Sequence, residues 1–543
     1  MNFSSLRHRR LFALTTLVLV PLRAAALETQ IGGAPVHLDV SETAVTRWHV
    51  DNGNVAPRGS LAYDPTGSNF GDLLDRLQVD ASRGQWFSLL RLDGALFGHV
   101  PTAAPGDSID RLLQDRYANR IDLEKIAVGY AGKNLELTLG DFYVSLGRGL
   151  VLSLRKIDEF GIDTTLRGAS STIRVQSLTL KAVGGVTNIV NNDESTGRQV
   201  GDPNDVVLGG AAEYRIGTIA IAGVQAADFR YQEGAFTSPT LPVTEIRNYG
   251  GSFEIPDLLE HGAFYAELDG QRRESAVPHQ GWAAYGSLNA FFGKWNALLE
   301  AKDYADFQPV RTSLDSTRFL EFSTVDFYNS APTLERVSQA LKQNANIVGA
   351  RLRLDARASE KFSPYASMGF FRDRIDNYDI FDPYAGVQIR WESGRASVSG
   401  GWRIDRNNAL SREPGGLYAR EWHVELDVAQ PITGAWNLEL AGFHRQHREA
   451  VTSFRPWSEG QSTLALRRGS TWTGSVGFEY STESPEVNRP YQPNAGLQWQ
   501  SDDTNNIVRL FAGGQRAGLK CVNGVCRNYP GFNGARIEVV LRR

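Results

Sequence analysis

Residues 348–357 read Val-Gly-Ala-Arg-Leu-Arg-Leu-Asp-Ala-Arg, and this stretch decides the fold class. Successive side chains of a β-strand point to opposite faces, so Leu352 and Leu354 share one face while Arg351 and Arg353 share the other. A soluble sandwich buries its apolar face in a shared core. A transmembrane barrel turns that face to lipid and its polar face to the lumen. The export signal described below and the 54 glycines favour the barrel.

The same alternation recurs along the chain, most clearly in its second half. In five stretches the residues of one parity, that is every second residue, are mostly apolar. These stretches are Ala385 to Trp391, Ala396 to Ile404, Trp422 to Val428, Trp436 to Leu440 and Trp472 to Tyr480. Many of these rows end in an aromatic residue near a turn, as the interfacial girdles of barrels do. We count roughly 18 to 24 segments of about ten residues, the length of a tilted spanning strand. The sequence therefore predicts an all-β fold, a large antiparallel transmembrane β-barrel.

The first 26 residues have the order of a secretory signal peptide. Three arginines lie within residues 7–10, an apolar run follows from Leu11 to Leu22, and residues 24–26 are three alanines suited to cleavage. The apolar run is shorter than the ~20 residues of a spanning helix. We expect residues 1–26 to be removed and residues 27–543 to form a single barrel domain in the cell outer membrane.

Charge narrows the range of partners. Cleavage removes four arginines and no acid, so the formal net charge goes from −4 to −8. Because a nucleic-acid partner favours a basic surface, we expect none. The expected partners are outer-membrane lipids, the barrel-assembly machinery, and a polar solute or polysaccharide, with no cofactor. The last strand ends in Arg542-Arg543 instead of the aromatic residue that this machinery typically reads.

Short and long connections alternate between the predicted strands. Residues 132–134, 392–395 and 431–434 have the length of periplasmic turns, whereas polar stretches such as 51–69 and 101–119 have the length of outer loops. The longest loop runs from Gln308 to Asn346, and its residues 332–343 have the pattern of a short helix. Loops of this length are commonly functional or disordered. This one is predicted to be either an inward-folded constriction or lid, or a plain surface loop.

The polar parity of these strands predicts a charged lumen wall. Rings and opposed patches of charge select and orient polar solutes in aqueous pores, although any hydrated interior also needs charge to stay wet. The predicted lining residues are Arg351, Arg353, Asp355, Arg357, Gln388, Arg390, Glu392, Arg403, Asp405, Glu421, His423, Glu425, Asp427 and Glu439.

Catalytic and metal-binding motifs are missing from the sequence. No Gly-x-Ser-x-Gly elbow, P-loop or His-Glu-x-x-His pattern occurs. His444 and His447 are three residues apart, so in a strand they face opposite sides and cannot hold one ion together. His423 lies on the inner parity among acids, where a solvated wall is favoured over a metal site. We expect no enzyme and no metal.

Several short motifs carry a family resemblance. The motifs are Gly140-Asp141-Phe142-Tyr143, Gly147-Arg148-Gly149-Leu150, Gly161-Ile162-Asp163, Tyr328-Asn329 and residues 332–335, together with the closing segment 513–526. With them the chain resembles an uncharacterised family of bacterial outer-membrane β-barrel proteins, a domain of unknown function. The resemblance implies a barrel and no assigned activity. The glycines would allow a bulge, a tight inward fold or a simple hairpin.

Three functions fit a barrel of this kind. The favoured one is a passive channel, or the barrel component of an export or uptake system, for a polar solute or polysaccharide. An outer-membrane barrel enzyme of the lipase or protease type is disfavoured because no nucleophile motif is present. A non-conducting surface scaffold or adhesion barrel, with its lumen filled by the loop 308–346, is the third.

Cys521 and Cys526 are the only cysteines, and in an exported chain a pair at this spacing predicts a local disulfide. Such a short loop stabilises the fold by roughly 2 kcal/mol at most. Both thiols should therefore resist alkylation until a reductant is added, as measured by mass spectrometry of the unfolded protein. Thiols that react without reduction would contradict the disulfide.

Overall fold

The computed structural model describes most of the chain. The described residues are 29–31, 34–50, 69–99, 117–157, 161–193, 198–231, 243–275, 278–310, 328–329, 345–375, 377–407, 410–411, 414–450, 453–483, 490–502, 505–516, 518–522, 525–529 and 531–542. The predicted signal peptide and the helix predicted at 332–343 lie outside these ranges.

The described residues form a closed antiparallel barrel of 24 strands, which confirms the predicted fold class. The first half of the wall consists of β2 (Ala34–His49), β3 (Phe70–Arg83), β4 (Trp86–Gly98), β5 (Arg120–Ala131), β6 (Leu135–Phe142), β11 (Thr165–Val175), β12 (Leu178–Asn188), β15 (Val206–Ile216), β16 (Ala220–Arg230), β17 (Glu245–Ile255), β18 (Gly262–Glu274) and β19 (His279–Phe292). The second half consists of β20 (Trp295–Ala305), β21 (Ile347–Ala356), β22 (Phe362–Asp373), β23 (Tyr378–Arg390), β24 (Arg395–Arg406), β25 (Leu417–Pro431), β26 (Trp436–Glu449), β27 (Trp457–Arg468), β28 (Trp472–Ser481), β29 (Tyr491–Gln500), β30 (Ile507–Gln515) and β33 (Phe532–Arg542).

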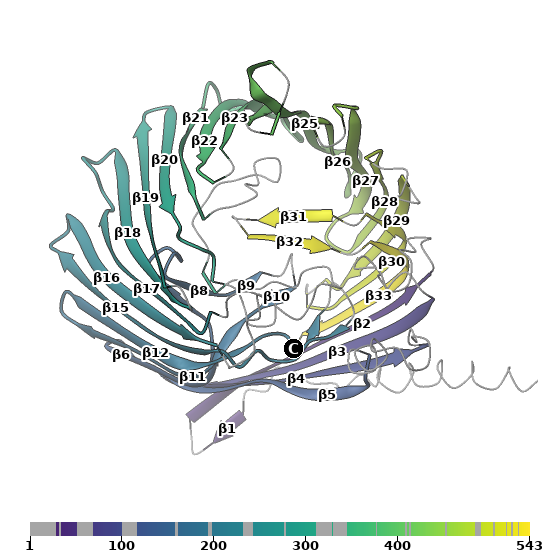
Figure 1. The fold of residues 1–543 in the computed structure, drawn as a ribbon. Helices are drawn as coiled ribbons and strands as arrows, with labels where there is room; N and C mark the ends of the chain where they lie inside the picture. Colours follow the sequence, from purple (N-terminus) through teal and green to yellow (C-terminus); the bar gives the residue numbers. More distant parts are fainter. Residues whose placement is uncertain are drawn as a thin grey trace, which may run out of the picture.

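The barrel closes where its last strand meets its first. β33 pairs antiparallel with β2 from Ser41 opposite Arg542 to His49 opposite Gly534. Viewed along the axis, the wall forms a continuous ring (Figure 1). Closure gives both terminal strands a backbone partner, which a lipid environment requires because it offers no hydrogen bonds of its own.

The remaining strands are short and lie outside this ring of pairings. They are β1 (Thr29–Ile31), β7 (Val144–Leu146), β8 (Leu152–Leu154), β9 (Lys156–Ile157), β10 (Ile162–Asp163), β13 (Asn192–Asp193), β14 (Arg198–Gln199), β31 (Gly518–Val522) and β32 (Val525–Tyr529). Pro414–Gly416 forms a 3-10 helix. No described helix is long and apolar enough to cross a membrane.

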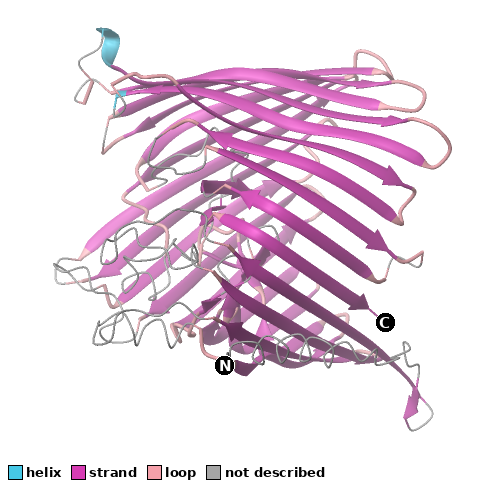
Figure 2. Cartoon of the chain, turned by 90° about the vertical axis from the view of Figure 1, so that its right-hand side faces the viewer, coloured by secondary structure: helices cyan, strands magenta, loops and turns pink. Residues whose placement is uncertain are grey.

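Connection lengths divide the barrel into two rims. Short turns such as 84–85, 132–134 and 293–294 lie at the end where β2 begins and β33 ends, which we call the turn rim. Connections such as 99–119, 143–164 and 306–346 lie at the opposite end, the loop rim. The tilted strands run between the two rims (Figure 2). The alternation of short and long connections is as the sequence predicted.

The outer face of the barrel is apolar and bordered by aromatic residues. Trp86, Trp295, Trp436 and Trp472 are exposed, and each is the first residue of its strand after a turn at the turn rim. A second set of exposed aromatic residues lies three to five positions inside the loop rim, and it contains Tyr249, Trp282, Trp402 and Trp422. Exposed leucines, isoleucines and valines lie between the two sets. This is the surface that a barrel presents to a bilayer.

The two faces can be tested with neighbouring residues of β28. Val476 is 58% exposed and shares its parity with the outward Trp472, whereas Ser475 shares its parity with the inward Glu479. Val476→Arg should cost about 2 to 4 kcal/mol, because it places a charge in the hydrocarbon layer. Ser475→Arg, the matched control at the same depth, should cost little because its side chain extends beside Ala465 and Gly496 into the interior.

Urea unfolding of the two variants from lipid vesicles measures this difference. Equal tolerance of arginine at both positions would contradict the assignment of the faces.

Candidate functional site

Between β6 and β11 the chain leaves the wall and folds into the barrel. This inward segment, residues 143–164, contains the hairpin of β7 and β8 and the pair of β9 and β10. The labels of β8, β9 and β10 lie inside the ring in Figure 1. The hairpin turns at Gly147-Arg148-Gly149, where both glycines have positive φ. The Gly147 and Gly161 motifs quoted above therefore belong to an inward fold, one of the alternatives that the glycines left open.

An apolar core holds the inward segment against the wall. Its side chains pack on inward-facing residues of β11, β12, β15, β16 and β17 and on the described part of the longest loop. The buried members are Phe142, Val144, Leu146, Val151, Leu152, Leu154, Leu166, Val183, Val207, Ala227, Phe229, Tyr231, Ile246, Val310 and Tyr328. Apolar burial of this extent stabilises the segment by the hydrophobic effect and explains why this stretch of inner wall is not polar.

Part of the longest loop also lies inside the barrel. Tyr328 is fully buried, and its hydroxyl donates a hydrogen bond to Asp205 Oδ2 at 2.6 Å. The side-chain amide of Asn329 donates to the Leu150 carbonyl at 2.9 Å. The described residues 328–329 therefore cover the inward segment, as the inward-folded alternative for this loop predicts.

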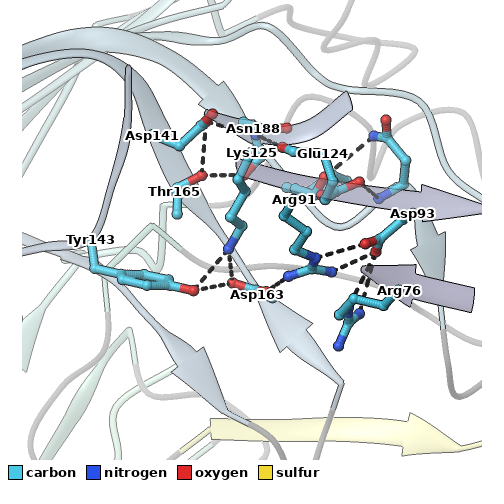
Figure 3. A network of polar contacts seen from close by, with 12 residues as sticks. Arg76, Arg91, Asp93, Glu124, Lys125, Asp141, Tyr143, Asp163, Thr165 and Asn188 are labelled. Atoms are coloured by element: carbon cyan, nitrogen blue, oxygen red, sulfur yellow. Dashed lines mark hydrogen bonds and ion pairs between the residues drawn. The ribbon is translucent and has the colours of Figure 1, made fainter. Parts of the chain in front are cut away.

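A buried network of charges ties the inward segment to β4 and β5 (Figure 3). Asp163 accepts hydrogen bonds from Arg91 Nη1 at 2.5 Å, from the Tyr143 hydroxyl at 2.5 Å and from Lys125 Nζ. Arg91 also contacts both oxygens of Asp93, at 2.7 and 2.6 Å. We call these five residues the anchor network. Each cation has an anionic partner, which buried charges require.

The electrostatics of the anchor network favour its ionised form. Asp163 lies in β10, which is not one of the spanning strands. Burial alone would raise the pKa of its carboxyl, but the Lys125 ammonium and the Arg91 guanidinium outweigh burial and hold the pKa well below its usual range. A carboxyl with a lowered pKa stabilises the fold above the pKa of the unfolded chain, and this contribution is lost only as the pH falls through the lowered value.

A second polar cluster fixes the point where the chain leaves the wall. Asp141 accepts hydrogen bonds from the Ile126 amide and the Asn188 side chain, both at 2.8 Å, and from Arg167 Nε at 3.1 Å. Gly140 has φ +105, and a Cβ there would lie 2.0 Å from the Ile126 carbonyl oxygen. The Gly140-Asp141 motif thus serves the close approach of two strands.

The tip of the inward hairpin reaches across to β18. The Arg148 guanidinium lies 3.8 Å from the centre of the Tyr265 ring, and the Arg148 amide donates to Glu267 Oε2 at 3.2 Å. Gly147 has φ +60, and a Cβ there would lie 2.3 Å from Glu267 Oε1, so another residue would be strained and would displace the Glu267 side chain. Glu267 also contacts Gln225, which connects the tip to β16.

The lining residues predicted on β21 and β24 mostly pair with one another. Arg353 contacts Asp355 at 2.8 Å and Arg403 contacts Asp405 at 2.7 Å, each within its own strand. Arg351 is only 4% exposed, and its guanidinium lies 5.8 Å from the centre of the Phe371 ring. Leu352 and Leu354 of β21 and Trp402 of β24 are exposed on the outer face. All three arginines have the opposite parity, so they point to the inner face of the wall.

Glu421 belongs to a cluster of charged side chains that was not predicted from the sequence. Its carboxylate lies 3.3 Å from His447 Nδ1, and His447 Nε2 lies 3.5 Å from Glu459. Glu459 contacts Arg445 at 3.3 Å and also binds Arg516, at the base of the β31–β32 hairpin. The described residues hold no group of three or more His, Cys, Asp or Glu side chains suited to a metal ion.

The other predicted lining residues are dispersed. Glu439 contacts Arg467 at 3.4 Å, and the buried His423 lies against the Tyr384 ring. Glu425 is half-buried. Gln388, Arg390 and Asp427 are exposed towards the turn rim, and Arg357 and Glu392 lie in turns there.

Sequence patterning missed the anchor network. Arg91 and Asp93 alternate with outward leucines of β4, so their inward parity was readable from the sequence. Lys125 was not readable in this way, because the bulge at Glu124 and Lys125 reverses the alternation along β5 and Ile121 and Leu123 on the same parity are exposed. Their partner Asp163 is 38 residues beyond Lys125, and no local pattern connects the two. The resemblance motif Gly161-Ile162-Asp163 was the available signal.

The two cysteines face each other across a hairpin. β31 pairs antiparallel with β32, and Cys521 is directly opposite Cys526. In Figure 1 this hairpin extends across the interior of the ring. The cysteine side chains are outside the described part of the structure, so the disulfide stays a prediction.

Comparisons with known proteins identify solved barrels of similar fold. The siderophore receptor PirA from Pseudomonas aeruginosa has 9% identity over 93% of this chain and 80% of its own, with a TM-score of 0.45. Pseudomonas aeruginosa OpdO has 10% identity over 82% and 97%, with a TM-score of 0.38. OccK2 (OpdF) from the same organism, solved with glucuronate, has 12% identity over 93% and 97%, with a TM-score of 0.36.

No protein-family model and no curated protein matches the chain. The resemblance to an uncharacterised family therefore remains an expectation. The closed 24-stranded barrel, with an apolar outer face between two sets of aromatic residues, defines the class. This protein is a large transmembrane β-barrel of the outer-membrane type.

Asp163→Asn tests the anchor network. Loss of the carboxylate leaves the buried Arg91 and Lys125 without full compensation, which should cost about 3 to 5 kcal/mol. The loss should act on the inward segment, because the wall keeps its backbone pairing. Hydrogen exchange should therefore accelerate in residues 143–157 while the wall strands stay protected.

Glu136→Gln is the matched control for this variant. Its partner Arg174 is exposed, so the exchange of both regions should stay unchanged. Equal exchange of the inward segment in Asp163→Asn and the native protein would contradict an anchoring role.

Proposed function

We propose that this barrel is a passive outer-membrane channel for a small polar solute. The observation that carries the proposal is the contrast between its faces. Leu352 and Leu354 are exposed on the outside of β21, while Arg351, Arg353 and Asp355 lie on the opposite parity. A polar inner wall keeps a lumen hydrated, and its charges select solutes.

The inward segment supports a selective channel over a wide pore. Barrels of more than about 16 strands enclose a wide interior unless the chain itself occupies it. Here the inward segment and residues 328–329 occupy part of the interior against β11 to β17. The predicted lining arginines lie on β21 to β24, farther along the wall, and Figure 1 labels β21, β22 and β23 towards the top of the ring. A solute path along β21 to β26 would meet paired charges on its wall.

The third hypothesis, a non-conducting scaffold, takes its support from the same inward segment. Two apolar cores inside the barrel, one around Leu152 and one around Tyr304, show that the chain fills part of its own interior. Conductance of the purified barrel in a planar bilayer separates the two functions. A folded barrel that conducts nothing would favour the scaffold.

Ion selectivity tests the channel directly. Neutralising Arg351, Arg353 and Arg357 to glutamine removes three positive charges from the proposed wall, so the reversal potential should shift towards cation selectivity. The shift should shrink at high salt, because the Debye length falls from about 10 Å at 0.1 M to about 3 Å at 1 M. Arg357 should contribute most, since Arg353 pairs with Asp355 and Arg351 is buried.

Arg247→Gln is the control for selectivity. Arg247 is exposed on the outer parity of β17 and pairs with Glu245, so its loss should leave the reversal potential unchanged. An identical reversal potential for the triple variant and the native barrel would overturn the proposed lumen wall.

A further inference from the structure

Arginines gather on the outer face of β22 to β26, at the loop rim. Arg372, Arg406 and Arg420 are exposed and Arg448 is half-buried. Each shares its parity with outward side chains of its strand, among them the exposed Trp402 for Arg406 and the exposed Trp422 for Arg420. These four residues, which we call the arginine layer, therefore lie outside the barrel.

Acidic partners are scarce in this layer. Asp379 forms two hydrogen bonds with Arg372, at 2.6 and 3.0 Å, and is also the register partner of Arg406. Arg406, Arg420 and Arg448 form no ion pair with any described residue. Among the residues that the structure describes, one aspartate thus faces four arginines, which leaves a local excess of positive charge.

Two of these arginines are placed directly against each other. Arg420 on β25 is the register partner of Arg448 on β26. Directly opposed residues of an antiparallel pair have Cβ atoms about 5 Å apart, and like charges in this position destabilise the sheet. An anion bound between the two guanidinium groups would remove this repulsion.

The depth of the layer indicates what kind of anion reaches it. Trp402 and Trp422 are register partners, and Arg420 lies two positions nearer the loop rim than Trp422. Exposed tryptophans mark the boundary between hydrocarbon and headgroups. Two residues of strand advance about 7 Å, which places the arginines at the level of lipid headgroups.

On β16 to β18, the same level of the outer face has no excess of charge. On β16 to β18 the outer parity carries three arginines, and each pairs with an acid at 2.8 Å or less: Arg230 with Asp228, Arg247 with Glu245, and Arg272 with Glu274. A general need for charge at the rim would produce such neutral pairs all around it. The arginine layer is therefore a local feature of β22 to β26.

We propose that the arginine layer binds the phosphate groups of a lipid headgroup in the membrane leaflet at the loop rim. Guanidinium groups donate two parallel hydrogen bonds to phosphate, and they are more weakly hydrated than ammonium groups. Trp402 and Trp422 would contact the acyl chains of the same lipid. Nothing in this site depends on conduction through the lumen.

Lipid binding to the purified full-length barrel in neutral detergent tests the proposal by native mass spectrometry. The probes are bisphosphorylated lipid A, the same lipid without its phosphates, and inorganic phosphate. The native barrel should bind the bisphosphorylated lipid about tenfold more tightly than the dephosphorylated one, the factor expected from a few charge-assisted hydrogen bonds. Millimolar inorganic phosphate should not displace it.

Arg420→Gln/Arg448→Gln should abolish the preference for the phosphorylated lipid. Arg247→Gln/Arg272→Gln, which removes two arginines at the same level of β17 and β18, is the matched control and should keep it. The heat-dependent gel mobility of each variant reports whether it is folded. If the double variant does not fold, Arg420→Gln alone replaces it and should weaken binding severalfold.

Three results would overturn the proposal. The first is an unchanged preference in the folded Arg420 variants, and the second is equal binding of both lipids by the native barrel. The third is full displacement by inorganic phosphate, which would indicate a site for free anions instead of lipid.

Discussion

Every backbone N–H and C=O in the wall needs a partner within the chain, because hydrocarbon offers none. This constraint closes the barrel by pairing β33 with β2 over nine residues of each strand, from Ser41 to His49 and from Gly534 to Arg542. Closure creates an inside and an outside, and the alternation of side chains then assigns each residue to one of them. The apolar belt, the buried charges and the two rims all follow from this pairing.

A barrel of 24 strands encloses more space than wall side chains fill, and the chain uses part of that space for itself. The inward segment combines two kinds of interaction with different consequences. Its apolar core supplies stability without strict geometry, whereas the anchor network of Arg91, Lys125 and Asp163 requires one arrangement. Buried ion pairs are costly to break, so they fix the position of the segment more than they add to stability.

The charges of this protein differ in organisation between the faces. Inside, arginines mostly lie beside acids, as Arg353 does with Asp355 and Arg445 with Glu459. Paired charges keep an interior wet without a strong net field. Outside, the pairs of β16 to β18 are also neutral, and the layer around Arg420 is the exception. The channel and the lipid site would therefore use arginine in separate ways.

Sequence alone determined the barrel class, the faces of the clearly alternating strands and the alternation of turns and loops, because a period of two residues is a local property. Gln388 and Arg403 could be assigned to a polar parity for the same reason. The strand count, the inward fold of residues 143–164 and the partners of Asp163 and Glu421 depended on tertiary structure. These contacts join residues on different strands or far apart in the chain, and only closure of the barrel brings them within hydrogen-bonding distance.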